Sequence, residues 1–100
     1  MSVENLAERM RSDLMRYAGL NYTVKFVFDE GGVLFLDGTV TPPVLSEADE
    51  DADCTLRLSL DNAEKLIDGQ LNPTLAYTMG RLKVDGSVGV ALKLASMMED

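Results

Sequence analysis

The sequence predicts an α+β domain in which helices cover a mixed, largely antiparallel sheet of about five strands. Several short stretches alternate apolar and polar side chains with the period of half-buried strands, and two of them are joined by a hairpin-type loop. Apolar stretches with helical spacing lie at both ends of the chain. With 100 residues, of which 46% are hydrophobic, the chain can bury a core of its own. We therefore expect residues 1–100 to form a single domain.

The first predicted element is an amphipathic helix over residues 3–17. Apolar side chains recur at helical spacing from Val3 to Tyr17, and charged side chains occupy the other faces. Gly19 follows, and we expect it to stop the helix.

Two strands joined by a hairpin come next. Residues 22–28 alternate with aromatic side chains on one face, and residues 33–41 form the returning strand. Pro42 and Pro43 end this strand because proline has no N–H group to donate to a ladder. An extra strand around Val40 would bring the sheet to five strands.

A third strand and a helix follow. Residues 54–60 alternate with apolar side chains on one face, which again indicates a strand. Ser59 or Asp61 can cap the next helix, and Gly69 ends it because glycine readily adopts the left-handed conformation wanted there.

The remaining elements are a short helix, a strand and a last helix. An asparagine N-cap followed by Pro73 starts the short helix, and Gly80 ends it. Residues 81–84 alternate as a strand does, and Ser87 can cap the last helix after a turn.

The last helix, predicted over residues 87–100, is apolar over most of its circumference. Lys93, Ser96 and Asp100 fall on one narrow polar stripe. The helix therefore needs apolar partners on more than one side. Three interpretations stay open: a helix sunk between the sheet and the first helix, a wall of an apolar cavity, or a helix that packs in a dimer.

Charge and composition exclude several functions. The net charge of −8 argues against nucleic acid, and it leaves at most transient contact with membranes. The sequence has no histidine, which removes the commonest general base and imidazole metal sites. We expect no catalytic residue, no metal and no cofactor. The acidic stretch 47–53 lacks the glycine and glutamate spacing of a calcium loop, so we interpret it as solvated.

We infer the cellular compartment from targeting and membrane-spanning segments that the sequence lacks. No apolar run approaches the length of a membrane-spanning helix, and the first residues lack the apolar core of a secretory signal. Cys54 is the only cysteine, so no internal disulfide can form, and we expect it to be a buried, inert thiol. A cytoplasmic protein is the expectation.

An ordered set of short motifs occupies residues 69–94. They are Gly69-Gln70-Leu71-Asn72-Pro73, Ala76, Gly80-Arg81-Leu82-Lys83-Val84-Asp85-Gly86 and Ala91-Leu92-Lys93-Leu94. Weaker pieces lie upstream at Asp37-Gly38 and residues 53–56. With these motifs in this order, the chain resembles the sterol carrier protein 2 (SCP-2) family of small lipid-binding domains.

The resemblance implies the same α+β fold and a non-enzymatic function, the binding and intracellular transfer of a lipid in an apolar cavity between sheet and helices. The lipid would be a sterol, a fatty acyl chain or an isoprenoid-like molecule. Leu94 and Met97 are the residues on which we most expect binding to depend. The full set of expected cavity residues is Phe26, Phe35, Leu56, Leu58, Leu66, Leu71, Leu75, Met79, Leu82, Val84, Val90, Leu94, Met97 and Met98.

A rigid, empty, lipid-sized cavity is too costly for so small a chain. A void of about 300 Å³ would cost on the order of 7 kcal/mol, a large part of the roughly 5–15 kcal/mol of a small domain. We therefore expect a site that is filled, collapsed or lined by mobile elements. The mobile elements would be the last helix and the short helix 72–79.

The alternative function is a protein-interaction or dimerisation module. Domains that resemble this family also occur as accessory factors in lipid or quinone biosynthesis, so the partner would be a second copy of the chain or an enzyme. The apolar surface of residues 88–98 would then contact protein instead of lipid.

Overall fold

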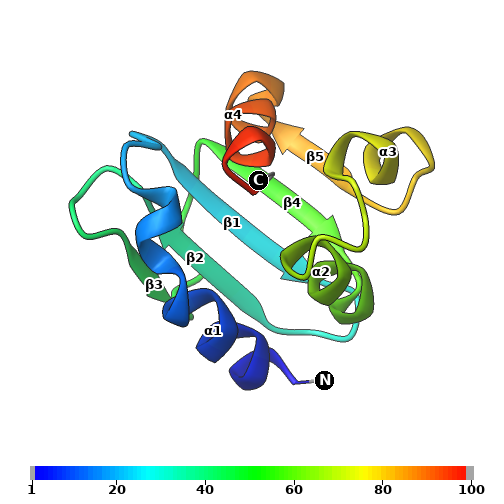
Figure 1. Ribbon diagram of the computed structural model, residues 1–100, viewed down its shortest axis with the longest axis horizontal. Helices are drawn as coiled ribbons and strands as arrows, with labels where there is room; N and C mark the ends of the chain where they lie inside the picture. Colours follow the sequence, from blue (N-terminus) through cyan, green and yellow to red (C-terminus); the bar gives the residue numbers. More distant parts are fainter. Residues whose placement is uncertain (1, 99–100) are drawn as a thin grey trace.

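The structure is a computed structural model that describes residues 2–98. Figure 1 shows four strands in succession after the N-terminal helical segment, followed by two helices, a last strand and a last helix. The elements are α1 (Val3–Ser12), the 3₁₀ helix η1 (Leu14–Tyr17), β1 (Thr23–Phe28), β2 (Val33–Asp37), β3 (Val44–Ser46), β4 (Cys54–Leu58), α2 (Leu60–Ile67), α3 (Pro73–Thr78), β5 (Lys83–Gly86) and α4 (Val88–Met98).

The strands form one five-stranded sheet in the order β3-β2-β1-β4-β5. β1 and β4 run parallel, and the other neighbouring strands are antiparallel. Helices α1, α2 and α4 lie on one face of the sheet, and α3 lies near the β5 edge (Figure 1). The predicted α+β class with a mixed, largely antiparallel sheet is confirmed. Within residues 2–98, no helix combines the length and apolar character needed to cross a membrane.

The core lies between the sheet and the helices that cover it. The register places Phe26 of β1 opposite Leu34 of β2 and Leu56 of β4, so their side chains share one face. Alternation along β1 and β4 buries every second side chain on this face, as the sequence predicts. Cys54 is fully buried there, as expected.

Several predicted elements differ in the structure. The strand predicted over residues 81–84 lies two residues later, as β5, and the returning strand predicted over residues 33–41 ends at Asp37. The predicted helix 3–17 breaks after Ser12, whose hydroxyl donates to the carbonyl of Arg9 (2.7 Å), and Asp13 leaves the helical conformation before η1 begins. The extra strand around Val40 is wrong: β2 ends at Asp37, whose carboxylate accepts from the Thr39 amide (2.9 Å) in a turn. The fifth strand, β3, lies beyond the prolines.

Local capping chemistry is confirmed at the helices of the second half. The Ser59 hydroxyl accepts from the amide of Asn62 at the start of α2, and the Asn72 side chain accepts from Leu75 at the start of α3. Ser87 does the same for Val90 in α4 (3.2 Å). These caps fix where α2, α3 and α4 begin relative to the sheet.

Gly86 joins β5 to α4 and is expected to tolerate no side chain. Its φ is +92°, and a Cβ there would lie 2.8 Å from the backbone oxygen of Asp53. A Gly86→Ala substitution should therefore lower the free energy of unfolding by about 2 kcal/mol or more, measured by urea denaturation. Gly89→Ala is the matched control, since its Cβ would meet only the Ser87 hydroxyl at 3.7 Å. Equal effects of the two substitutions would contradict this explanation.

Candidate functional site

Three small apolar hollows lie in a row between the sheet and α4. The largest, about 80 Å³, is bounded by α3, β5 and α4, and the middle one, about 30 Å³, continues beneath α4. The third, about 10 Å³, lies where α1 and α2 meet the sheet. Neighbouring hollows share lining residues: Pro73, Leu82, Ala91 and Ala95 join the first two, and Phe26, Leu66 and Met98 join the last two.

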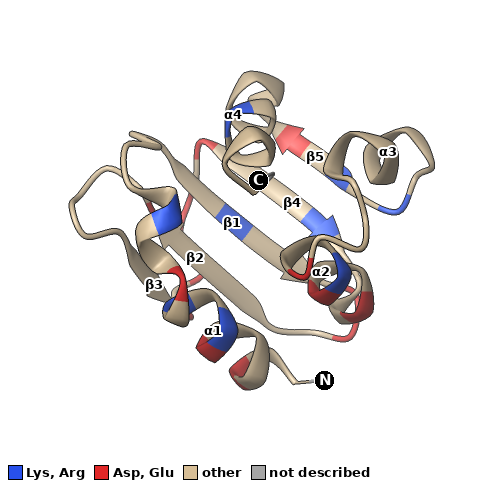
Figure 2. Cartoon of the chain, in the orientation of Figure 1, with Lys and Arg blue, Asp and Glu red and all other residues tan. Residues whose placement is uncertain are grey.

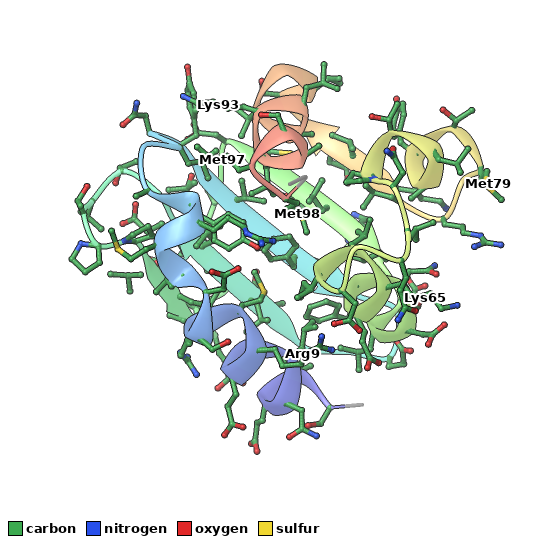
Figure 3. All side chains as sticks on the ribbon, viewed as in Figure 1. Arg9, Lys65, Met79, Lys93, Met97 and Met98 are labelled. Carbon is green, nitrogen blue, oxygen red and sulfur yellow. The ribbon has the colours of Figure 1, made fainter. Side chains whose placement is uncertain are left out.

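One face of α4 forms the roof of the row. Ala91 and Ala95 stand one turn apart and line both the largest and the middle hollow. Their methyl groups leave room that larger side chains would fill. Val88 and Leu92 extend the same face over the largest hollow, and Met98 carries it to the smallest. In Figure 3, Met98 projects from the lower end of α4.

Helix α3 forms the other wall of the largest hollow. Pro73 is buried, so it anchors the helix, and Tyr77 and Thr74 face α4 across the hollow. Thr74 and Tyr77 are the residues with a polar side-chain group in an otherwise apolar lining.

An ion-pair cluster holds α1 to α2 beside the smallest hollow. The Arg9 guanidinium lies 3.3 Å from the Glu64 carboxylate and also pairs with Asp68, both on α2 or its C-cap. Figure 3 labels Arg9 between the two helices. Leu6 and Met10 of α1 line the hollow on this side, so the cluster fixes one end of the row.

The Cys54 thiol is buried in the core. Burial raises the pKa of the Cys54 thiol, and the charges of Asp53 and Asp85 raise it further, so the thiol stays protonated near neutral pH. Such a protonated, buried thiol is a poor nucleophile.

The acidic stretch 47–53 is tied to the sheet by polar contacts. The Asp53 carboxylate accepts from the amide (2.9 Å) and the hydroxyl (3.1 Å) of Thr23, and Asp49 pairs with the Lys25 ammonium (3.0 Å). Among residues 2–98, no three His, Cys, Asp or Glu side chains come together as a metal site would require.

Eight of the expected cavity residues line the row. They are Phe26, Leu56, Leu58, Leu66, Leu82, Val84, Leu94 and Met98. Leu71 and Val90 are buried in the core without lining these hollows, and Met97 packs partly buried against that core.

Three expected cavity residues lie elsewhere. Phe35 pairs in register with Lys25 and so faces the opposite side of the sheet from Phe26. β2 is apolar on both faces, so its sequence alone did not decide which face meets the helices. Leu75 and Met79 are 51% and 53% exposed, because α3 turns its other side to the core.

The sequence reasoning missed residues on both helical walls. Val88, Ala91, Leu92 and Ala95 recur at helical spacing and share one face of α4. This spacing in the sequence could have identified the α4 residues that line the hollows. The missed lining residues are Leu6, Met10, Phe28, Ala63, Ile67, Pro73, Thr74, Tyr77, Val88, Ala91, Leu92 and Ala95.

The hollows are small compared with a lipid. Ligand sites start at about 300 Å³, whereas the largest hollow of the row has about 80 Å³. A lipid can therefore enter only if a wall moves, in agreement with the expected collapsed site. The terminal helix α4 and the short helix α3 bound the largest hollow, and these are the two elements expected to move.

Comparison with known proteins adds a family and a set of relatives. The family model described as "SCP-2 sterol transfer family" matches residues 3–99. Hydroxysteroid dehydrogenase-like protein 2 of Bos taurus is 28% identical over 96 residues, covering 91% of this chain. Sterol carrier protein 2 of Rattus norvegicus is 39% identical over 54 residues, covering 54% of this chain. The matched regions span 22% and 10% of those two proteins.

Solved structures share the fold. The sterol carrier protein domain 2 of Helicoverpa armigera superimposes with a TM-score of 0.73 at 24% identity, covering 95% of this chain and 80% of that one. A structure named UbiJ-SCP2, a ubiquinone synthesis protein, gives a TM-score of 0.70 at 19% identity, covering 95% and 90%. At these identities the likeness concerns the arrangement of the elements.

Proposed function

The chain belongs to the SCP-2 sterol transfer family, and from this premise we propose that it binds one lipid molecule in the row of hollows and carries it without chemical change. The observation that supports the proposal most is the continuity of the row. Its lining is apolar from α3 to α1, and each hollow shares side chains with the next. A long apolar molecule lying beneath α4 would fill all three.

The lining also suggests the class of lipid. An apolar body with a single small polar head would place that head at the hydroxyl groups of Thr74 and Tyr77. Sterols, fatty acids and isoprenoid-like molecules have this form. Binding and release need no nucleophile, metal or cofactor, so the proposed function is non-enzymatic.

Lipid binding is expected to raise the melting temperature. A ligand that binds only the folded chain, present at a concentration of about 100 times its Kd, adds about 2.7 kcal/mol to the free energy of unfolding. In a domain of this size, that raises the melting temperature by about 10 °C or more. Differential scanning fluorimetry with a long-chain fatty acid, an acyl-CoA and a sterol tests this. A short-chain acid with the same headgroup is the control. Absence of a shift with all three lipids would contradict the proposal.

A second candidate is an interaction module for another protein. Val88 and Leu92 of α4 are 48% and 58% exposed, so this helix keeps apolar surface outside the core. The names of two relatives, a dehydrogenase-like protein and a ubiquinone synthesis protein, fit an accessory role beside an enzyme. Analytical ultracentrifugation separates the two candidates: a concentration-dependent dimer without bound lipid supports the module, and a monomer carrying lipid supports lipid binding.

A further inference from the structure

Helix α4 carries its one charged residue, Lys93, on the side turned away from α3. In Figure 2 it is the blue segment of α4, and Figure 3 shows Lys93 and Met97 on this side. The Lys93 ammonium lies 5.4 Å from the centroid of the Tyr22 ring, within the range of a cation–π interaction. Met97, one turn further along, packs against the core, and α4 also contacts η1. One long side of α4 is therefore attached to the N-terminal half of the chain.

Tyr22 is a fixed partner for this contact. Its carbonyl accepts from the Gly38 amide (3.0 Å), and the Gly38 carbonyl accepts from the amide of Asn21 (2.9 Å). The next residue, Thr23, begins β1, and its amide donates to the Asp53 carboxylate (2.9 Å). Because the backbone is bonded on both sides of Tyr22, its ring offers α4 an attachment point that belongs to the sheet and does not move with the helix.

The side of α4 that faces α3 is built differently. Ala91 and Ala95 present methyl groups there, and the largest hollow, about 80 Å³, lies between them and α3. The Thr78 hydroxyl of α3 donates within its own helix, to the Thr74 carbonyl (3.0 Å), and the Ser96 hydroxyl of α4 likewise bonds within α4. Small side chains around a space lose few dispersion contacts when the helices separate, so this side opens at lower cost than a closely packed one.

We propose that α4 opens on its α3 side while the contact between Lys93 and Tyr22 holds its other side, so that lipid enters and leaves between α3 and α4. This inference rests on the proposed lipid binding and gives it a route. Tilting α4 about its held side would widen the largest and the middle hollow, which Ala91 and Ala95 both line. The helix need not leave the sheet to make room for a lipid.

Cross-linking the two sides of α4 separately tests the direction of opening. Thr74→Cys with Leu92→Cys places an exposed thiol on each wall of the largest hollow. Tyr22→Cys with Lys93→Cys places the pair on the held side. A short bismaleimide joins each pair, and Cys54 is spared because it is buried. N-ethylmaleimide on the first pair is the control, since it adds similar bulk without a link.

The measurement is the release of a bound fluorescent fatty acid into excess unlabelled fatty acid, followed by stopped flow. The link between residues 74 and 92 should slow release by at least about tenfold and trap a fatty acid loaded beforehand, because it closes the opening. The link between residues 22 and 93 should change the rate by less than about twofold, because that side stays in place. The N-ethylmaleimide control should release its ligand, and a circular dichroism melt checks that each protein is folded.

Hydrogen exchange without lipid tests the held side by itself. Lys93→Met removes the charge and keeps a side chain of similar shape. The amides of residues 88–98 should then exchange about two- to fivefold faster, as expected for loss of an exposed cation–π contact. Lys83→Met is the matched control: Val84 lines the largest hollow, so its neighbour Lys83, opposite Arg57 in register, faces the other side of the sheet.

Three results would overturn this direction of opening. Normal release from the protein linked between residues 74 and 92 would place the route elsewhere. Equal slowing by the two links would show that α4 lifts as a whole. Hydrogen exchange no faster in Lys93→Met than in Lys83→Met would show that the contact with Tyr22 does not hold the helix. A wild type that binds no fatty acid would instead refute the proposed function, and hydrogen exchange would still decide how α4 is attached.

Discussion

Replacement of Ala95 by phenylalanine is expected to lower lipid affinity by at least about tenfold while the chain stays folded. Ala95 lines both the largest and the middle hollow, and its side chain is partly exposed in a helix at the end of the described chain. A benzyl group in that position would occupy the space that the lipid needs. Because the group enters an existing hollow, its cost to folding should be about 1–3 kcal/mol at most.

Ser96→Phe is the matched control for this substitution. Ser96 is the next residue of α4, is exposed, and donates its hydroxyl to the Lys93 carbonyl (2.9 Å) on the solvent side. The Ser96→Phe substitution adds the same ring outside the row of hollows. Titration with a fluorescent fatty acid should show normal affinity for Ser96→Phe and weak affinity for Ala95→Phe. Equal affinities would show that the lipid does not lie beneath α4.

Replacement of Leu94 by alanine is expected to lower the free energy of unfolding by about 3 kcal/mol. Leu94 is 1% exposed and lines the middle hollow, so the substitution enlarges an existing space that the surrounding structure has not closed. This loss is a large part of the roughly 5–15 kcal/mol expected for a small domain. Urea denaturation of the purified variant measures it.

Leu92→Ala is the control on the same helix, because Leu92 is 58% exposed and its truncation should cost less than about 1 kcal/mol. Similar losses for the two variants would contradict the burial of α4 on the sheet. A bulky polar residue in place of Leu94, which is almost fully buried, should disturb folding and binding together, so Ala95 is the cleaner probe of binding.

The elements that local chemistry determines could be predicted from the sequence. Ser59, Asn72 and Ser87 cap helices as expected because a hydroxyl or amide oxygen can satisfy the free N–H groups of the first turn. The alternation in β1 and β4 predicted their buried faces. β3 was missed because it is short and forms by pairing with β2, a contact between segments that no local pattern records.

The candidate site was predicted only in part, because its lining also depends on contacts between segments that no local pattern records. Phe26 and Phe35 are both apolar and lie on paired strands, and only the register of β1 against β2 shows that they face opposite sides. On α3, the burial of Pro73 and Ala76 determines which side is turned outward, and this leaves Leu75 exposed. A six-residue helix is too short for its periodicity to reveal that orientation.

Native mass spectrometry of the purified protein, with organic extraction of whatever is released, tests lipid binding most directly. We expect an added mass of lipid size, one per chain, for the wild type and for Ser96→Phe, and its loss in Ala95→Phe. A wild-type mass equal to that of the chain alone, unchanged after incubation with fatty acid and sterol, would show that the protein does not bind a lipid.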